Sequence, residues 1–305
     1  MKIKKGGFIY CPKGEHEWEK DTFMTPHAMG TRKGEIRIWG GVRDNKGISR
    51  IKYIDVAEEN PCSIMRICDH PSLDIGNVGC FDDNGVILGD IIPVHDKLYM
   101  YYVGFQLVQK VKFFAFSGLA VSEDRGETFK RYSETPILDR TTTGRYGRCI
   151  HTVLYENGVF RCWYAVINDW KVIGGIPYPV YNIWYTESAD GIHFPQEDKV
   201  LCVDVKDNEY RIGRPKVYKT EKGYEMFYTR DLLTKEYLAG YAVSEDGIHW
   251  ERKDEAFVLE KSVMGWDSEM ACYPVKCQTL EKTYIFYNGN GMGKTGVGYA
   301  ALTEK

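Results

Sequence analysis

The chain has 305 residues, a formal net charge of −3 and 14% aromatic residues. Its Lys and Arg residues are scattered along the sequence, which argues against a basic nucleic-acid-binding surface. No segment approaches the roughly eighteen apolar residues of a membrane helix, and the basic N-terminal stretch is not followed by the apolar core of a signal peptide. We therefore expect a soluble, cytoplasmic protein.

An aromatic strand pattern recurs roughly every sixty residues. Its five copies lie at residues 35–40, 98–103, 160–165, 224–229 and 283–288, with Trp39, Tyr102, Tyr164, Tyr228 and Tyr287 at equivalent positions. A second strand pattern follows each copy, at residues 49–55, 117–121, 182–186, 239–243 and 297–301. Turns that contain Asp and Gly follow three of these patterns and favour hairpins, because Gly accepts a positive φ. Each unit is therefore predicted to be an antiparallel meander.

A strand repeat of this length is typical of a propeller, because about four short strands and their turns fill one period. The sequence predicts an all-β fold, a five-bladed β-propeller with four-stranded antiparallel blades, in which residues 1–305 form one domain. The last copy ends after its third strand, so we expect Gly7–Cys11 to supply the missing outer strand and close the ring. The chain ends should then be neighbours, and the repeated aromatic residues should pack between blades.

The segments before the aromatic strands should form the innermost strands, which converge on the propeller axis. All of them carry ionisable groups beside apolar residues. Buried strands disfavour such groups unless the groups are paired or take part in binding or catalysis. Asp83 and Glu269 are the predicted catalytic pair, because each precedes an apolar strand where burial raises a carboxyl pKa and a nearby Arg lowers one. The predicted substrate-binding residues are His27, Arg43, Asp44, Arg148, His151, Arg211, Arg214, Asp267, Tyr273 and Asn290.

Four of these candidates are arginines, and guanidinium groups bind phosphate in bidentate fashion. Their convergence predicts an anionic substrate: a sugar phosphate, a nucleotide-sugar or an acidic sugar. A neighbouring Asp is an equally good partner for any one arginine, so Arg43 and Asp44 could simply form a pair. Asp82 is interpreted as a turn residue that bonds its own backbone.

The segment between Ile167 and Tyr181 is interpreted as a long loop inserted within blade three. Its Trp170, Tyr178 and Tyr181 could stack on a sugar ring above the funnel, or the loop could serve as a purely structural lid.

The chain resembles the five-bladed propeller glycosidases of the arabinanase, levansucrase and invertase type, which are similar to glycoside hydrolase family 43. It resembles more closely their cytoplasmic members associated with bacterial polysaccharide gene clusters. The resemblance extends over almost the whole chain. The strings that carry it lie at residues 26–28, 39–44, 49–51, 81–86, 213–215, 265–270 and 287–291.

This resemblance implies three carboxylates on separate inner strands: an Asp base or nucleophile, a pKa-tuning Asp and a Glu acid. The chain departs from that pattern, with His27 in place of the first Asp and Arg148 and His151 in place of the Glu. Arg43 and Asp44 resemble the Arg-Asp-Pro string whose Asp holds sugar hydroxyls in the invertase group, but no Pro follows here. The mannoside phosphorylases, which share the propeller, combine one carboxylic acid with basic residues for phosphate.

We therefore predict a glycoside hydrolase-like enzyme that cleaves or transfers a glycosidic bond of an anionic or activated sugar in bacterial surface-polysaccharide metabolism. Two alternatives remain open: a glycoside phosphorylase of the same fold, and a non-catalytic sugar-binding or scaffold propeller in a biosynthetic complex. The expected partner is a carbohydrate, with no nucleic acid and no membrane.

No cofactor or metal is expected. Some relatives hold calcium on the axis near an inner-strand His, as His151 would be, but no clustered Asp/Asn set demands an ion here. The nine cysteines include no C-x-x-C pair and are interpreted as buried thiols rather than zinc ligands.

Overall fold

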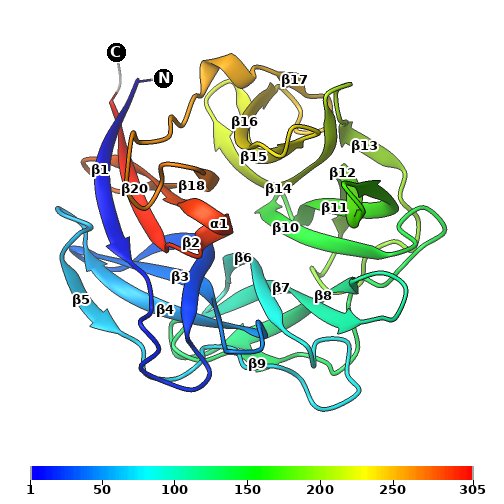
Figure 1. Ribbon diagram of the computed structural model, residues 1–305, viewed down its shortest axis with the longest axis horizontal. Helices are drawn as coiled ribbons and strands as arrows, with labels where there is room; N and C mark the ends of the chain where they lie inside the picture. The colour runs from blue at the N-terminus through cyan, green and yellow to red at the C-terminus, as the bar shows by residue number, and fades with distance from the viewer. Residues whose placement is uncertain (1, 304–305) are drawn as a thin grey trace.

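The computed structural model describes the chain from Lys2 to Thr303, and the ribbon forms five blades around a central axis (Figure 1). Each blade has four antiparallel strands, as predicted. From the axis outward, blade 1 holds β2 (Asp21–Arg32), β3 (Glu35–Arg43), β4 (Ser49–Ala57) and β5 (Ile64–Ile67); blade 2 holds β6 (Val86–Val94), β7 (Lys97–Leu107), β8 (Phe113–Ser122) and β9 (Lys130–Arg131); blade 3 holds β10 (Gly147–Glu156), β11 (Val159–Ile173), β12 (Ile176–Ser188) and β13 (Val200–Val203); blade 4 holds β14 (Glu209–Thr220), β15 (Gly223–Leu232), β16 (Tyr237–Ser244) and β17 (Glu251–Arg252); blade 5 holds β18 (Cys272–Gln278), β19 (Thr283–Asn288), β20 (Val297–Thr303) and β1 (Lys2–Tyr10).

Helical structure is confined to short turns. A 3-10 turn covers Asp254–Ala256, and α1 covers Asn290–Gly293. No helix within residues 2–303 is long and apolar enough to cross a membrane.

Strand β1 closes the ring, because it pairs with β20 as the outer strand of blade 5. This confirms the predicted closure, although the strand begins at Lys2 rather than Gly7 and ends before Cys11. Lys2 is opposite Thr303, so the ends of the described chain are neighbours (Figure 1). This pairing covers the edge of β20, which would otherwise be exposed.

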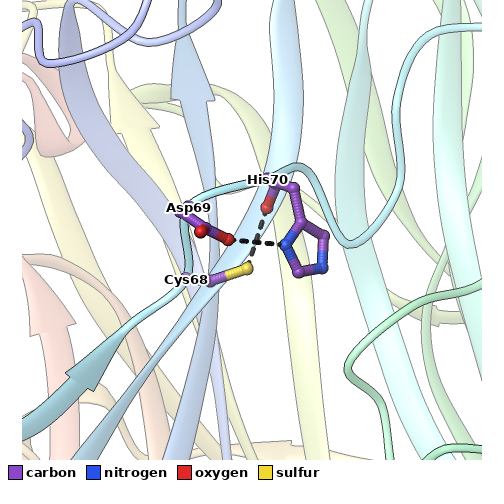
Figure 2. A group of neighbouring side chains, drawn as sticks. All are labelled: Cys68, Asp69 and His70. Atoms are coloured by element: carbon purple, nitrogen blue, oxygen red, sulfur yellow. Dashed lines mark hydrogen bonds and ion pairs between the residues drawn. The ribbon is translucent and has the colours of Figure 1, made fainter.

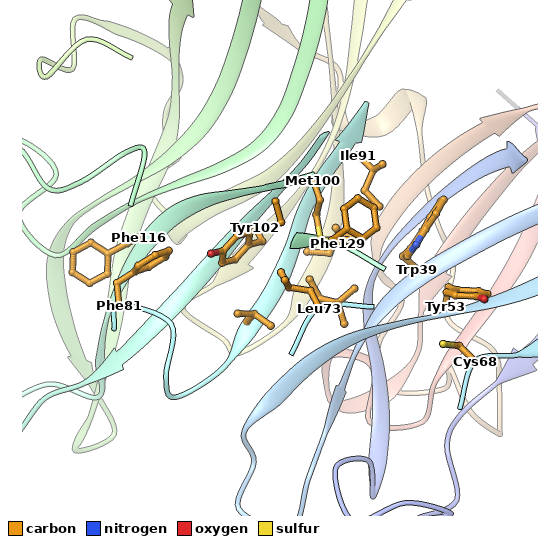
Figure 3. Packing of buried hydrophobic residues seen from close by; sticks show 14 residues of the cluster. Trp39, Tyr53, Cys68, Leu73, Phe81, Ile91, Met100, Tyr102, Phe116 and Phe129 are labelled. Carbon is orange, nitrogen blue, oxygen red and sulfur yellow. The ribbon is translucent and has the colours of Figure 1, made fainter. Parts of the chain in front are cut away.

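The repeated aromatic residues pack inside the molecule, as predicted, and are at most 1% exposed. Trp39 joins one apolar cluster with Tyr102 and Met100, so that the cluster links blades 1 and 2 (Figure 3). The indole N–H of Trp39 also donates to the carbonyl of Gly126, at 2.9 Å, in the hairpin of blade 2. Blade-to-blade packing therefore combines burial with directed hydrogen bonds.

In blades 2 to 5 the repeated tyrosine also donates to an aspartate that pairs with a cation. We call this trio the clamp. Its members are Tyr102, Asp82 and Arg131; Tyr164, Asp198 and Arg148; Tyr228, Asp254 and Arg252; and Tyr287, Asp267 and Lys5. Each clamp supplies a buried phenol with the partner that burial requires.

The predicted loop between Ile167 and Tyr181 is instead an extension of the β11–β12 hairpin, so the loop interpretation is wrong. Strand pairing continues to Ile173 opposite Ile176, and the turn is made by Gly174 and Gly175, with φ of 59° and 82°. Two successive positive φ angles are typical of the type I′ turns that match the twist of paired strands.

Candidate functional site

Each of the five inner strands shifts its pairing register at a similar level of the disc. The shifts fall between Met24 and His27, Leu88 and Asp90, Ile150 and Thr152, Gly213 and Lys216, and Cys272 and Val275. The residues left out of the pairing include Thr25, Gly89, His151, Arg214 and Tyr273, and these five line one cavity. Bulges re-aim side chains and are common beside active sites. We call this cavity, whose volume is about 10 Å³, the axial hollow.

Three residues of the hollow have left-handed backbone conformations. The φ angles are 51° at Thr25, 57° at Arg214 and 53° at Tyr273, and proline follows each of them. Such a conformation costs a residue with a β-carbon about 1–2 kcal/mol. It persists where the surrounding structure holds it, often at functional sites.

The guanidinium of Arg214 lies in the hollow without an acidic partner. Its Nη1 donates to the carbonyl of Leu88 at 2.8 Å and lies 3.5 Å from Nδ1 of His151. Within residues 2–303 no carboxylate forms an ion pair with it. Burial lowers the pKa of His151 well below its usual value, and Arg214 and Lys216 lower it further. His151 is therefore neutral, and it contributes no charge that would compete with Arg214.

Beside the hollow, Asp90 joins four blades. Its Oδ1 accepts from Nζ of Lys216 at 2.8 Å and lies 3.0 Å from Nδ1 of His27, while Oδ2 accepts from the N–H of Val153 at 2.9 Å. Burial alone would raise the pKa of Asp90, but Lys216 and His27 outweigh it and lower the pKa. Burial also lowers the pKa of His27, which is therefore neutral and donates from Nδ1.

The hollow consequently carries a net positive charge. Asp90 neutralises Lys216, and the charge of Arg214 remains. Sequence reasoning missed Asp90 and Lys216. The available signals were a carboxylate inside the apolar run of β6 and a lysine directly after Pro215 in an inner strand.

Thr25 offers the hollow an unused hydrogen-bonding group. Its Oγ1 is buried and has no partner. Its backbone N–H donates to Oδ1 of Asn288 at 2.7 Å, and this amide donates in turn to the carbonyls of Phe23 and Gly296. Asn288 thus holds blade 1 against blade 5 and fixes Thr25 in place.

The structure brings together five of the predicted binding residues. His151, Arg214 and Tyr273 line the hollow, and His27 reaches it through Asp90 and Lys216. Arg211 does not line the hollow and lies behind Tyr273. It pairs with Asp231 at 2.7 Å and lies 6.0 Å from the ring of Tyr237, whose hydroxyl donates to that of Tyr273 at 3.1 Å.

Two other predicted residues belong to clamps. Arg148 is fully buried, and its Nε lies 2.8 Å from Oδ1 of Asp198, while its other nitrogens donate to the carbonyls of Asp139 and Pro195. Asp267 pairs with Lys5 at 2.5 Å and accepts from Tyr287 at 2.8 Å.

Three more predicted residues lie in or beside loops at strand ends. Asp44 accepts from the N–H groups of Lys46 and Ile48 and pairs with Arg50 at 3.1 Å, not with Arg43. Arg43 has a buried Nε without a partner. Asn290 caps the backbone N–H groups of Glu269 and Met270, at 2.7 and 3.0 Å. Their contact with substrate stays a prediction.

Asp83 and Glu269 are not joined to the hollow by any hydrogen bond or ion pair that the structure of residues 2–303 contains. Asp83 accepts from the N–H of Gly79 at 2.9 Å and from the amide of Asn84 at 2.5 Å. Glu269 is exposed. Their catalytic roles stay predictions. Asp82 lies in a turn, as predicted, but its side chain is fully buried and bonds Arg131 and Tyr102 instead of its own backbone.

One group of possible metal ligands lies outside the hollow. Cys68, Asp69 and His70 follow β5, with their ligand atoms within 4.8 Å of one another (Figure 2). The thiol donates to the carbonyl of His70 at 2.8 Å, and burial raises its pKa, which favours the protonated form that does not bind metal. In the hollow itself, Arg214 and Lys216 bring positive charge where calcium would need oxygen ligands, so the residues present do not suit that ion.

Similar proteins are found by sequence and by structure. No protein-family model matches the chain. It is 30% identical to the uncharacterized protein Rv1502 of Mycobacterium tuberculosis (strain ATCC 25618 / H37Rv), over 99% of both chains. It is also 30% identical to a 1,2-beta-oligomannan phosphorylase of Thermoanaerobacter sp. (strain X514), over 41% of this chain and 44% of that protein.

Solved structures share the fold at low sequence identity. A glycoside hydrolase superposes with a TM-score of 0.74 at 16% identity, covering 99% of this chain and 91% of the other. A structure from work on the GH130 family of mannoside phosphorylases, whose hydrolases target beta-1,2 mannosidic linkages in Candida mannan, has a TM-score of 0.70 at 13% identity, covering 99% and 94%. The beta-1,2-mannobiose phosphorylase of Listeria innocua has a TM-score of 0.64 at 13% identity, covering 99% and 96%.

The likeness to Rv1502 extends over 99% of both proteins. The strand order of the blades agrees with the propeller fold of the similar solved structures. The chain therefore belongs to the family of the Mycobacterium tuberculosis protein Rv1502, and its fold is that of the five-bladed propeller glycosidases.

Proposed function

We propose that the protein is an enzyme that cleaves or transfers the glycosidic bond of a sugar with an anionic group, which the axial hollow binds. The observation that carries this proposal is the guanidinium of Arg214, which faces the hollow without a carboxylate. A half-buried cation without a carboxylate partner favours an anionic ligand, and Arg suits phosphate and carboxylate oxygens. Oγ1 of Thr25 offers a further hydrogen bond to the ligand.

The size of the hollow limits what it binds. Its volume of about 10 Å³ is close to that of a single water site and far below the ~300–1,000 Å³ of pockets that enclose whole drug-sized ligands. The hollow thus admits at most the tip of one anionic group, and the sugar itself would lie toward the ends of the inner strands. Glu269 remains the proposed general acid there, and Asp83 the proposed base or nucleophile. Surface-polysaccharide metabolism is the proposed context.

Phosphorolysis is a second candidate, because the same uncompensated cation suits inorganic phosphate. A 1,2-beta-oligomannan phosphorylase and a beta-1,2-mannobiose phosphorylase among the similar proteins favour it. A sugar-binding propeller without catalysis is the third candidate. The residues of the described chain that line the hollow include no Asp or Glu, which favours binding over hydrolysis at that point.

The test is a turnover assay. The protein is incubated with sugar phosphates, nucleotide-sugars and beta-1,2-mannobiose, with and without inorganic phosphate, and released reducing sugar or sugar 1-phosphate is measured. We expect turnover of at least one anionic sugar. Release from mannobiose only with phosphate would select the phosphorylase, and binding without turnover would select the scaffold.

Variants link turnover to the site. Arg214→Gln should lower kcat/KM by at least about tenfold, since it removes a charge-assisted contact. Glu269→Gln and Asp83→Asn should each lower turnover by about 10²-fold if they are the acid and base. Lys222→Gln, in an exposed turn, is the matched control. Unchanged turnover in Arg214→Gln would contradict the proposed role of the hollow.

A further inference from the structure

The blade-3 hairpin places a set of aromatic rings at the end of the disc where the inner strands begin. Trp170 lies on the part of β11 that extends beyond Gly147, the first residue of β10. Its ring centroid is 5.5 Å from that of Phe113 and 6.3 Å from that of Tyr146. Phe105 and Phe114 continue the cluster, at 5.0 Å from Phe113 and 6.1 Å from Tyr146. We call these five residues the rim platform.

The rings of the rim platform pack against one another but are not fully covered. All five side chains keep partial exposure, unlike the repeated aromatic residues between blades. The indole N–H of Trp170 is buried and has no partner, so it is the exposed part of the ring that a ligand could reach. Partly exposed rings suit the face of a sugar, which presents C–H groups.

The charges around the platform are mainly positive. Residues 105–114, 139–146 and 168–173 hold five basic side chains and two acidic ones, in a chain whose net charge is −3. The guanidinium of Arg140 lies 4.9 Å from the ring of Phe114, and that of Arg145 lies 5.7 Å from the ring of Tyr146. Arg145 donates to the carbonyl of Asn168 at 2.8 Å and pairs with no carboxylate of the described chain.

Packed tyrosines lie between the platform hairpin and the axial hollow. Tyr181 of β12 packs against Gly213, where a Cβ atom would lie 2.6 Å from its ring, and Gly213 directly precedes Arg214. Arg211 lies 5.4 Å from the ring of Tyr181 and 6.0 Å from that of Tyr237. The positive charge of the hollow and that of the platform are therefore two separate regions, with packed tyrosines between them.

From this arrangement we infer that the rim platform is a second subsite, and that the substrate is an oligosaccharide with acidic groups on more than one sugar unit. This inference rests on the proposed function and names its substrate class. A neutral sugar chain would stack on the rings but would not use the surrounding cations. A nucleotide-sugar concentrates its charge in one diphosphate, whereas the two positive regions match acidic groups on separate units.

The test is equilibrium binding, measured by calorimetry and by quenching of tryptophan fluorescence. The probes are the α-1,4-linked trimer of galacturonic acid, the uncharged α-1,4-linked galactose trimer, and uridine monophosphate. We expect the acidic trimer to bind at least about tenfold more tightly than the neutral one, with an affinity that falls as salt screens the charges. Trp170→Ala and Arg145→Gln should each weaken it by about tenfold, the size of a stacking or cation contact.

Controls separate a lost contact from lost folding. Trp170→Phe keeps a ring for packing but lacks the N–H, and circular dichroism checks each variant. Val172→Ala, at the exposed tip of the same hairpin, should bind the trimer as the wild type does. Equal binding of the two trimers, stronger binding of uridine monophosphate, or full affinity in both Trp170→Ala and Arg145→Gln would overturn the inference. Normal trimer binding without turnover would contradict only the proposed enzyme.

Discussion

Backbone strain at Arg214 can be measured by comparing alanine with glycine at this position. Arg214→Ala and Arg214→Gly remove the same guanidinium contacts to Leu88 and His151, and they differ only by a methyl group. At a φ of 57°, a residue with a β-carbon costs about 1–2 kcal/mol that glycine does not. In an ordinary strand the order is the opposite, because glycine is less stable than alanine by about 0.5–1 kcal/mol. We therefore expect Arg214→Gly to be more stable than Arg214→Ala by about 1 kcal/mol.

Urea unfolding gives the free energy of unfolding of each variant, provided that the slopes agree. Lys219, an exposed residue on the same strand without a positive φ, provides the control pair, in which alanine should be the more stable. Both Arg214 variants should lose anion binding. A glycine variant that is more stable than the alanine variant, while both lose anion binding, is the pattern expected of strain at an active site. Arg214→Ala as stable as Arg214→Gly would refute the reasoning.

Two further predictions concern stability. Lys5→Met should lower the free energy of unfolding by roughly 2–3 kcal/mol, less than the ~3–5 kcal/mol of a fully enclosed pair because the Lys5 side chain keeps 31% exposure while Asp267 keeps 1%. Denaturant unfolding measures this, and an equal effect of the exposed control Lys4→Met would contradict the clamp. Burial lowers the pKa of His151 in the folded protein. The stability that neutral His151 contributes is therefore complete above its pKa in the unfolded chain, near 6.5, and is lost as the pH falls from there toward the lower pKa in the folded state. His151→Gln should therefore flatten the fall in stability between pH 7.5 and 5.5 by up to about 1.4 kcal/mol per pH unit, and an unchanged slope would count against a neutral buried His151.

The blade count and the closing strand could be predicted because they depend on local patterns. Alternating aromatic residues and Asp-Gly turns identify strands and hairpins without knowledge of distant contacts. The loop interpretation of residues 168–180 was wrong because two prolines obscured the pairing, although Gly174 and Gly175 were the signal of a tight turn.

The site could be predicted only in part, because convergence on the axis depends on register. The bulges at Thr25, Arg214 and Tyr273 arise where five blades meet, and the following prolines were their only local sign. Asp90 looks like a misplaced charge in an apolar strand until Lys216, 126 residues away, and His27 are placed beside it. The sequence reasoning had assigned Arg148 and Asp267 to the funnel, but the clamps show that each has a partner inside its own blade.

The pairing of β1 with β20 has a consequence for biosynthesis. Opposed residues in this ladder, such as Lys2 and Thr303, are separated by nearly the whole chain. During translation the first strand emerges long before its partner exists, so the disc closes only after β20 has left the ribosome. Contacts between such distant residues are slow to form. Until they form, the unpaired strand edges are exposed to aggregation and to chaperones.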